Sequence, residues 1–278
     1  MNFDHGKVEP VKSIISETKE LVLDIPLKKV DESILPGVTV MVVTRNRKQF
    51  AGLIIDNWKR VNYPPEKLQL LIIDDSDDTK MGPIMELKAL KDPRISYCYI
   101  KPSTTDIPHT IGSKRNHGMT VAKYDFVCML DDDDFMYNDS ILARVLTILS
   151  YKKGCVYSDQ LGVYNLKHES SYVIENIPHV PEGTMMITKA FWLTQKFSET
   201  AVAESIGLIS GREMEMMKIP WFYNCVALYH GNNHTMITKN MHTLGNRNKM
   251  RKAMEISLNI WKTAFPKSFQ TAVKLIPV

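Results

Sequence analysis

The sequence predicts an α/β fold, with a mostly parallel central sheet flanked by helices and a mixed C-terminal half. Short apolar runs alternate with segments of helical character between residues 38 and 140, as in β-α-β units. Two of these runs end abruptly in adjacent aspartates, and after Ser140 the alternation becomes irregular. Right-handed crossovers make such strands parallel, and ligands bind at their carboxyl ends. We therefore expect a ligand site where the two acidic clusters meet.

The elements alternate regularly up to residue 140. The β-branched run from Val38 to Val43 begins the core, and Trp58 marks the helix that follows it. Apolar runs predict strands at 38–43, 68–73, 95–100, 126–130, 155–157, 172–174 and 225–228. Helices are expected at about 47–60, 82–91, from 113 and at 140–151. The polar segment 1–36, which ends at Pro36-Gly37, is expected to be an N-terminal arm.

Composition limits the class of protein. The chain has 278 residues, and 44% of them are hydrophobic, enough for one large domain with appendages. The net charge of +4, from 35 basic and 31 acidic residues, is too mild for a nucleic-acid groove. Cysteines 98, 128, 155 and 225 form no CxxC pair, so we expect reduced core thiols. Without a signal-like or membrane-spanning segment, the chain is expected to be soluble and cytoplasmic.

The C-terminal tail, residues 236–278, is expected to be helical. Its basic segment 246–263 places Met250, Met254, Leu258 and Trp261 on one stripe. Such a stripe usually packs on the core. A membrane-peripheral role or homo-oligomer formation through this helix is the alternative.

The acidic run at 131–134 directly follows an apolar strand, Phe126 to Leu130. Four adjacent carboxylates repel one another and need a cation or hydrogen-bond donors to remain ionised. Oxygen ligands suit Mg²⁺ or Mn²⁺. The alternative is a solvated acidic turn that caps the helix from 140. An EF-hand is excluded, because Met136 and Leu142 stand where its glycine and glutamate are required.

Four motifs in order resemble family 2 glycosyltransferases. They are Thr44-Arg45-Asn46-Arg47, the segment 72–78, Gly112-Ser-Lys-Arg-Asn-His-Gly118 and Leu130-Asp-Asp-Asp-Asp134. The resemblance implies a GT-A fold, a nucleotide-diphosphate sugar donor, a divalent metal and inversion at the anomeric carbon. It makes residues 37–140 the nucleotide-sugar-binding half and residues 141–235 the acceptor-binding half of one domain.

The resemblance assigns the donor site to the first two motifs. It places Thr44, Arg45 and Arg47 at the nucleotide, although a solvated loop would also explain the two arginines. Asp74 or Asp75 is expected to accept a hydrogen bond from the base, and the resemblance favours Asp75. An Asx turn is the structural alternative for that aspartate.

The third motif begins a helix with two cations. Lys114 and Arg115 conflict with the helix dipole unless an anion is present, and a donor diphosphate would relieve this conflict. By resemblance, Arg115 faces the donor and Asn116 ties down the main chain.

The fourth motif carries the expected metal site. Asp131 and Asp133 match the outer carboxylates of the family's Asp-x-Asp pattern, and Asp132 stands in its variable place. We expect Asp133 to bind Mn²⁺ or Mg²⁺ and Asp131 to contact ribose or sugar, with Asp131 the second choice of metal ligand. His230 is expected to complete the metal site, ahead of His234. An ordinary core or surface histidine is the alternative.

The acceptor side is less defined by sequence. Glu204 is the expected general base, with Glu213 in reserve, but Ser205 replaces the second acid of the family's pair. A glutamate on a helix surface is the alternative. Trp192 and Trp221 are candidates to stack on an acceptor sugar, although tryptophans are more often buried.

The function expected from this pattern is metal-dependent, inverting transfer of a sugar from a UDP-sugar to a glycan or glycosylated acceptor. UDP is the favoured nucleotide of the donor. The choice between UDP and dTDP or GDP stays open, because a carboxylate that faces an imide accepts uracil and thymine alike. The alternatives are a non-catalytic GT-A domain that only binds nucleotide or glycan, a sugar-1-phosphate nucleotidyltransferase, and a structural protein. The nucleotidyltransferase would need a glycine-rich loop where the chain has Thr-Arg-Asn-Arg-Lys.

Overall fold

The computed structural model describes residues 30–101, 109–166, 170–174, 177, 180–230 and 233. The chain divides into two compact units, residues 1–35 and 36–278. The described part of the first unit forms the 3-10 turn Glu32–Ile34, capped by the Asp31 side chain. The rest of the predicted arm, the predicted tail and His234 lie outside the described residues.

The central sheet of the second unit has seven strands in the order β10-β6-β9-β4-β1-β2-β3. β1 is parallel to β2 and β4, β2 to β3, and β6 to β10, whereas β9 runs antiparallel to β4 and β6. The predicted mostly parallel sheet is therefore confirmed. The strands are β1 Val38–Thr44, β2 Leu68–Asp74, β3 Ile95–Tyr99, β4 Phe126–Asp131, β6 Cys155–Tyr157, β9 Met186–Thr188 and β10 Met216–Lys218.

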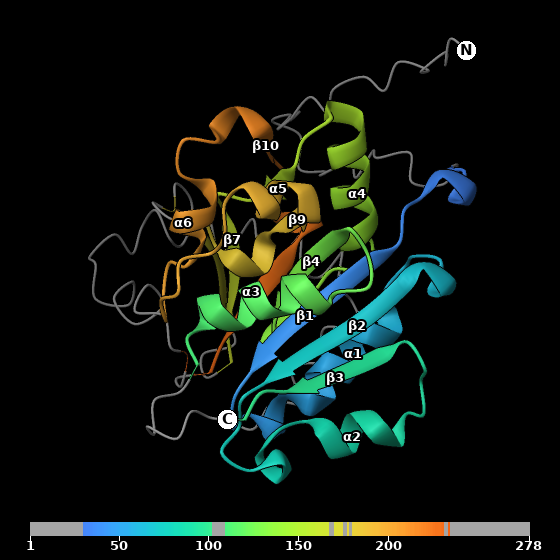
Figure 1. Cartoon of the computed structure of the whole chain (residues 1–278), viewed down its shortest axis with the longest axis vertical. Helices are drawn as coiled ribbons and strands as arrows, with labels where there is room; N and C mark the ends of the chain where they lie inside the picture. Colours follow the sequence, from blue (N-terminus) through green and yellow to red (C-terminus); the bar gives the residue numbers. More distant parts are fainter. Residues whose placement is uncertain are drawn as a thin grey trace. The chain divides into compact units, whose positions relative to one another are not determined.

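Helices lie on both faces of this sheet (Figure 1). They are α1 Ala51–Arg60, α2 Ile84–Ala89, α3 Ile111–Val121, α4 Ser140–Tyr151, α5 Lys189–Thr194 and α6 Ser205–Ile209. Alternate residues of the strands, such as Met41 and Ile73, pack against Met119 of α3 in the largest core cluster. α1 lies on the opposite face and buries Leu53 and Ile54. None of the helices in these ranges has the length and apolar character that crossing a membrane requires.

A second, smaller sheet has the order β5-β11-β7-β8. Its strands are β5 Asp134–Met136, β7 Leu161–Asn165, β8 Ser170–Ile174 and β11 Cys225–Tyr229. β5 pairs antiparallel with β11, so that Asp134 lies opposite Ala227. Phe135, Trp221 and Val226 form a core cluster beside it. Because β4 belongs to the first sheet and β5 to the second, the acidic run joins the two sheets.

Several short elements were not predicted. β5, β9 and β10 have three residues each and β7 has five, lengths over which apolar periodicity gives little signal. The first helix was expected from about residue 47 but begins at Ala51. Residues 48–50 form a 3-10 turn, after Asn46 with a positive φ of 52°.

Arg144 joins β4 to the residues before β9 and is fully buried. Its guanidinium donates to the main-chain oxygens of Met129, at 3.4 Å, and Met185, at 3.1 Å. We expect Arg144→Met to lower the free energy of unfolding by about 3 kcal/mol, because these buried acceptors lose their donor. Urea unfolding followed by tryptophan fluorescence measures the loss. Arg94→Met, at a half-buried arginine paired with Asp92, is the control and should cost about 1 kcal/mol or less; equal losses would contradict the expectation.

The two glycines of the α3 motif have different neighbours. A Cβ at Gly112 would overlap the main-chain oxygen of Ser198, whereas a Cβ at Gly118 would meet side chains alone, the flexible end of Met41 at 2.6 Å and Ile73 Cγ1 at 3.2 Å. Gly112→Ala should therefore cost about 3 kcal/mol of stability and Gly118→Ala about 1–2 kcal/mol. Thermal unfolding of the two variants tests this order, and a reversed order would show that α3 does not rest on the 198–200 segment.

Candidate functional site

The four aspartates occupy the junction between the two sheets. β4 ends at Asp131, Asp132 and Asp133 form a turn, and β5 begins at Asp134. Only 2% of Asp132 and 8% of Asp133 are exposed, whereas the Asp131 side chain is 41% exposed. The solvated-turn alternative is therefore wrong for the residues after Asp131. A buried acidic turn requires compensating positive charge.

Arg47 supplies that charge on one side of the turn. Its guanidinium lies 2.9 Å from Asp132 Oδ1 and 2.5 Å from Asp133 Oδ2, and it stacks on the Phe50 ring with its Cζ 4.4 Å from the ring centroid. Thr44 donates its hydroxyl to Asp132 Oδ2 at 2.6 Å. The predicted nucleotide contacts Thr44 and Arg47 are thus already engaged with the acidic turn.

His230 completes this group from the end of β11. Its Nε2 lies 3.1 Å from Asp133 Oδ2 and 3.5 Å from the Arg47 guanidinium. The ring packs against Phe50, with centroids 4.9 Å apart. Asn233, which the sequence did not single out, accepts from the His230 main-chain nitrogen at 3.0 Å. The register of β5 with β11 brings these residues to Asp133, although about a hundred residues of chain lie between them.

The carboxylates of the turn differ in their electrostatic surroundings. Burial raises the pKa of Asp132 to about 7, against the opposing charge of Arg47. Burial also acts on Asp133, but hydrogen bonds and charge from His230 and Arg47 prevail and lower its pKa. Burial, with Asp131 next, raises the pKa of Asp134 well above its usual range. Among these three carboxylates, Asp133 is thus the one whose pKa is lowered, and Asp134 lies buried beside the Cys225 thiol.

Arg115 compensates charge on the other side of the turn. Its Nε donates to Glu204 Oε1 at 2.8 Å and its NH2 atom to Asp131 Oδ1 at 3.0 Å. The third nitrogen, NH1, is buried and has no hydrogen-bond partner among the described residues. Burial raises the pKa of Glu204, and the charge of Arg115 opposes that shift. The structure thus brings the predicted base and the predicted donor contact together as a buried ion pair.

Lys114 is held by the end of β2. Its Nζ lies 2.7 Å from Asp75 Oδ1 and 3.1 Å from the Thr44 main-chain oxygen. The second oxygen of Asp75 accepts from the His109 main-chain nitrogen at 3.0 Å and lies 3.4 Å from Arg45. The anion expected beside this end of α3 is thus the protein's own Asp75, so the helix needs no diphosphate to balance Lys114.

Asp74 has a structural role in the fold. One oxygen accepts from the Ser76 main-chain nitrogen at 2.8 Å and from its hydroxyl at 2.5 Å, and the other accepts from the Tyr97 hydroxyl. The predicted Asx turn is therefore made by Asp74 rather than Asp75. Both Asp74 oxygens are engaged within the protein, as are both oxygens of the fully buried Asp75, so the structure does not distinguish between them as the partner of a base.

The remaining predicted residues are separated from this group. Asn116 bonds the main chain of Phe197, at 3.0 and 3.1 Å, and accepts from the Trp192 indole at 3.0 Å. Trp192 and Trp221 are 4% and 6% exposed and belong to core clusters, so the predicted stacking role does not fit the structure. Glu213 is exposed on a turn before β10, a strand at the sheet edge away from β1 and β2, which does not favour it as the reserve base.

Besides Asn233, Glu182 is a second residue at the site that was missed from the sequence. Glu182 precedes β9, and its Oε1 accepts from the Ser205 hydroxyl at 2.7 Å and from the Ser205 main-chain nitrogen at 3.1 Å. No motif or spacing indicated it, since it lies in a loop about fifty residues after the acidic turn. Gly183 beside it leaves room for the turn, because a Cβ there would lie 3.0 Å from Asp131 Oδ2.

The residues around Asp133 fit a divalent cation in their chemistry. A carboxylate oxygen and an imidazole nitrogen 3.1 Å apart are suitable neighbouring ligands, and the Arg47 guanidinium stands as a cation between them. The described ranges contain no group of three His, Cys, Asp or Glu side chains arranged to hold a metal. The bound substrate and water are candidate sources of further ligands.

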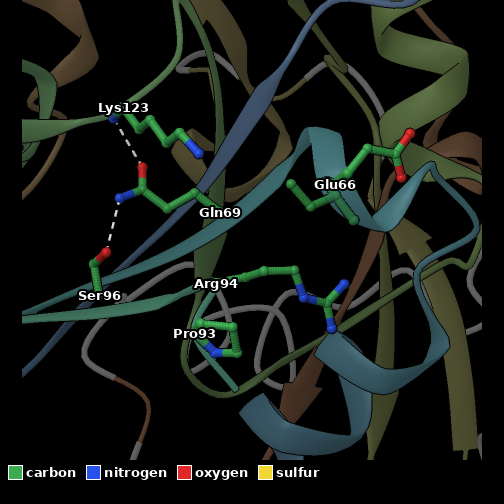
Figure 2. Close-up of a pocket in the computed structure, with 7 residues that line it drawn as sticks. Glu66, Gln69, Pro93, Arg94, Ser96 and Lys123 are labelled. Atoms are coloured by element: carbon green, nitrogen blue, oxygen red, sulfur yellow. Dashed lines mark hydrogen bonds between the residues drawn. The ribbon is translucent and has the colours of Figure 1, made fainter.

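A separate pocket lies at the amino ends of the strands, whereas the acidic site lies at their carboxyl ends. It has a volume of about 260 Å³ and is lined by residues at the amino ends of β2 and β3. Figure 2 shows Gln69 across this pocket, accepting from the Lys123 main chain and donating to Ser96. It shares no residue with the acidic site, so we assign it no part in the chemistry.

Comparison with known proteins gives concordant results. The model of glycosyl transferase family 2 matches residues 39–200. A beta-1,3-glucosyltransferase of Campylobacter jejuni, which acts on GalNAc(5)-diNAcBac-PP-undecaprenol, is 27% identical over 166 residues. The match covers 59% of this chain and 50% of that protein, so the chain spans about half the length of this curated relative.

Two solved structures share the fold. S. aureus TarS 1–349 in complex with UDP-GlcNAc superposes with a TM-score of 0.54 at 13% identity, over 84% of this chain and 69% of that one. The mannosyltransferase PcManGT from Pyrobaculum calidifontis, in complex with GDP-Man and Mn²⁺, gives a TM-score of 0.55 at 14% identity, over 89% and 76%. At such identities the likeness shows the fold. Because the family model covers more than half of the sequence, the chain belongs to glycosyl transferase family 2 and has the GT-A fold.

Proposed function

We propose that this chain transfers a sugar from a nucleotide-diphosphate donor, with UDP favoured, to a hydroxyl of a glycan or glycosylated acceptor. The carrying observation is the buried turn at Asp132 and Asp133, which is bridged by the Arg47 cation and flanked by His230. Such a turn at the carboxyl ends of parallel strands binds a divalent cation and the phosphates that the cation carries. Membership of family 2 supports glycosyl transfer over nucleotidyl transfer.

The donor would lie along the carboxyl ends of β1, β2 and β4. Asp75 offers a carboxylate to the imide of a uracil base, and Lys114 and Arg45 fix its orientation. TarS is in complex with UDP-GlcNAc and PcManGT with GDP-Man, which supports a nucleotide sugar without deciding the base. The partly exposed Asp131 is placed to meet ribose or sugar hydroxyls.

The reaction proposed is a direct displacement with inversion. A bound Mn²⁺ or Mg²⁺ would supply positive charge to the two phosphates as the nucleoside diphosphate departs. The chain's own contribution is to keep the pKa of Asp133 low and to offer an oxygen of the donor the NH1 of Arg115, which has no hydrogen-bond partner among the described residues. The acceptor enters from the Glu204 and Glu182 side, where its hydroxyl must lose a proton. A domain that only binds nucleotide would bind UDP and release none from a donor.

Donor binding should depend on both metal and Asp133. Saturating UDP with Mn²⁺ is expected to raise the unfolding midpoint by about 5 °C or more, and neither compound should do so alone. Asp133→Asn should abolish the metal-dependent part, because an amide is a poor ligand for a hard cation. Thermal shift with UDP, GDP and dTDP tests this. Asp159→Asn, at a surface pair with Lys218, is the matched control; a shift that survives in Asp133→Asn would contradict the assignment.

Arg47 should compete with the divalent cation for the acidic turn. Arg47→Met leaves Asp132 and Asp133 without their cation and is expected to lower the free energy of unfolding by about 3 kcal/mol. Mn²⁺ alone should then stabilise this variant more than it stabilises the unchanged protein. Calorimetric unfolding with and without Mn²⁺ measures both effects. Arg45→Met is the control, since Arg45 pairs mainly with the exposed Asp77, and an equal response to Mn²⁺ in the two variants would refute the competition.

A further inference from the structure

The acceptor side contains two glutamates in different situations. Glu204 is 3% exposed, and its Oε1 accepts from Arg115 at 2.8 Å. Arg115 is itself 2% exposed and pairs also with Asp131. A carboxylate held in this way balances a buried guanidinium, and its protonation would leave that charge paired with Asp131 alone. Glu204 is therefore suited to position Arg115 rather than to exchange protons with an incoming hydroxyl.

Glu182 is only half-buried and lies on the same side of the acidic turn. Its place follows from the pairing of β9 with β4, which continues as a hydrogen bond of 2.9 Å from the Met129 nitrogen to the Met185 oxygen. Three residues before Met185, the chain passes the end of β4 at Asp131. Gly183 allows this approach, since a Cβ there would meet the Asp131 carboxylate at 3.0 Å.

Ser205 orients the Glu182 carboxylate. Its hydroxyl, at 2.7 Å, and its main-chain nitrogen, at 3.1 Å, converge on the same oxygen, Oε1. Ser205 is fully buried at the start of α6, so these two donors are fixed by the fold. The second oxygen, Oε2, makes no hydrogen bond to any residue in the described ranges. One oxygen is thus held while the other is left for a ligand.

We infer that Glu182 is the general base of the transfer, positioned by Ser205, and that Glu204 serves only to hold Arg115; this inference rests on the proposed function. The proton of the acceptor hydroxyl passes to Glu182 Oε2. The acceptor oxygen forms its bond to the anomeric carbon as the bond from that carbon to the diphosphate oxygen breaks. The electron pair of the broken bond leaves with the nucleoside diphosphate. Glu182 thereby fills the role that a second acid at the position of Ser205 would otherwise have.

The test uses the full chain with Mn²⁺ and water as acceptor, and measures UDP released from UDP-glucose and UDP-GlcNAc. UDP affinity is measured separately by calorimetry. Glu182→Gln should lower the rate of UDP release about 100-fold or more, with the UDP dissociation constant changed less than about threefold, because Oε1 can still be held as an amide oxygen. Glu204→Gln should lower the unfolding midpoint and reduce UDP release less than about tenfold. Glu66→Gln, at the opposite edge of the sheet, is the matched control.

A double variant separates catalysis from structure. Ser205 Oγ lies 2.7 Å from the Glu182 carboxylate, so Glu182→Gln with Ser205→Asp returns a carboxylate close to the same place. We expect about a tenfold recovery of UDP release over Glu182→Gln alone, and none with Ser205→Asn. Equal rates in the two double variants, or a Glu182→Gln enzyme of undiminished rate, would overturn the assignment.

The two proposals fail in different ways. If the unchanged chain binds UDP with Mn²⁺ and Glu204→Gln alone abolishes release, the donor site stands and Glu182 is not the base. If the unchanged chain binds UDP but releases none from either donor, the assignment of Glu182 as the general base is contradicted, while the proposed nucleotide binding stands. If it binds no UDP at all, the proposed function falls, and the base assignment falls with it.

Discussion

The neutralisation of the carboxylates between the two sheets is the constraint on which the rest of the site depends. β4 ends in one sheet and β5 begins in the other, so the aspartates between them are buried by both. Unpaired, each charge would cost several kcal/mol. Arg47 after β1 and Arg115 in α3 pair with opposite sides of the turn. The site is therefore preorganised by the same ion pairs that allow the sheets to meet.

These pairs divide the site into two parts with different chemistry. On the Arg47 side, Asp133 is kept ionised beside His230, as the binding of a cation and its phosphates requires. On the Arg115 side, Glu204 neutralises the guanidinium, and Ser205, the next residue, orients Glu182. Glu204 and Ser205 are adjacent at the start of α6, and the first neutralises the buried Arg115 while the second orients the more accessible carboxylate of Glu182. In the proposed reaction, this arrangement would separate departure of the diphosphate from deprotonation of the acceptor.

Strong local signals made the first half of the fold predictable, and long-range pairing made the rest unpredictable. β1 and β2 are seven-residue apolar strands, fully buried, and both were predicted within one residue. The three-residue strands β5 and β9 take their conformation from the strands they pair with, so no local sequence pattern predicts them. The same holds within the site. Motifs indicated Asp133 and Arg115, but only the register of β9 with β4 could reveal Glu182 beside Asp131.

The position of Arg47 has a consequence for how the site admits a substrate. A guanidinium paired with both Asp132 and Asp133 satisfies the turn before any ligand arrives, so the fold does not require a metal to be stable. Entry of a divalent cation would then exchange the single charge of the guanidinium for a double charge at Asp133. The Arg47 side chain is 18% exposed and stacked on Phe50, and its planar fork of donors would suit a phosphate once the carboxylates are released. Metal binding and phosphate binding would therefore be coupled through the Arg47 side chain. When the metal takes the place of Arg47 at Asp133, the guanidinium would pair instead with a phosphate of the donor.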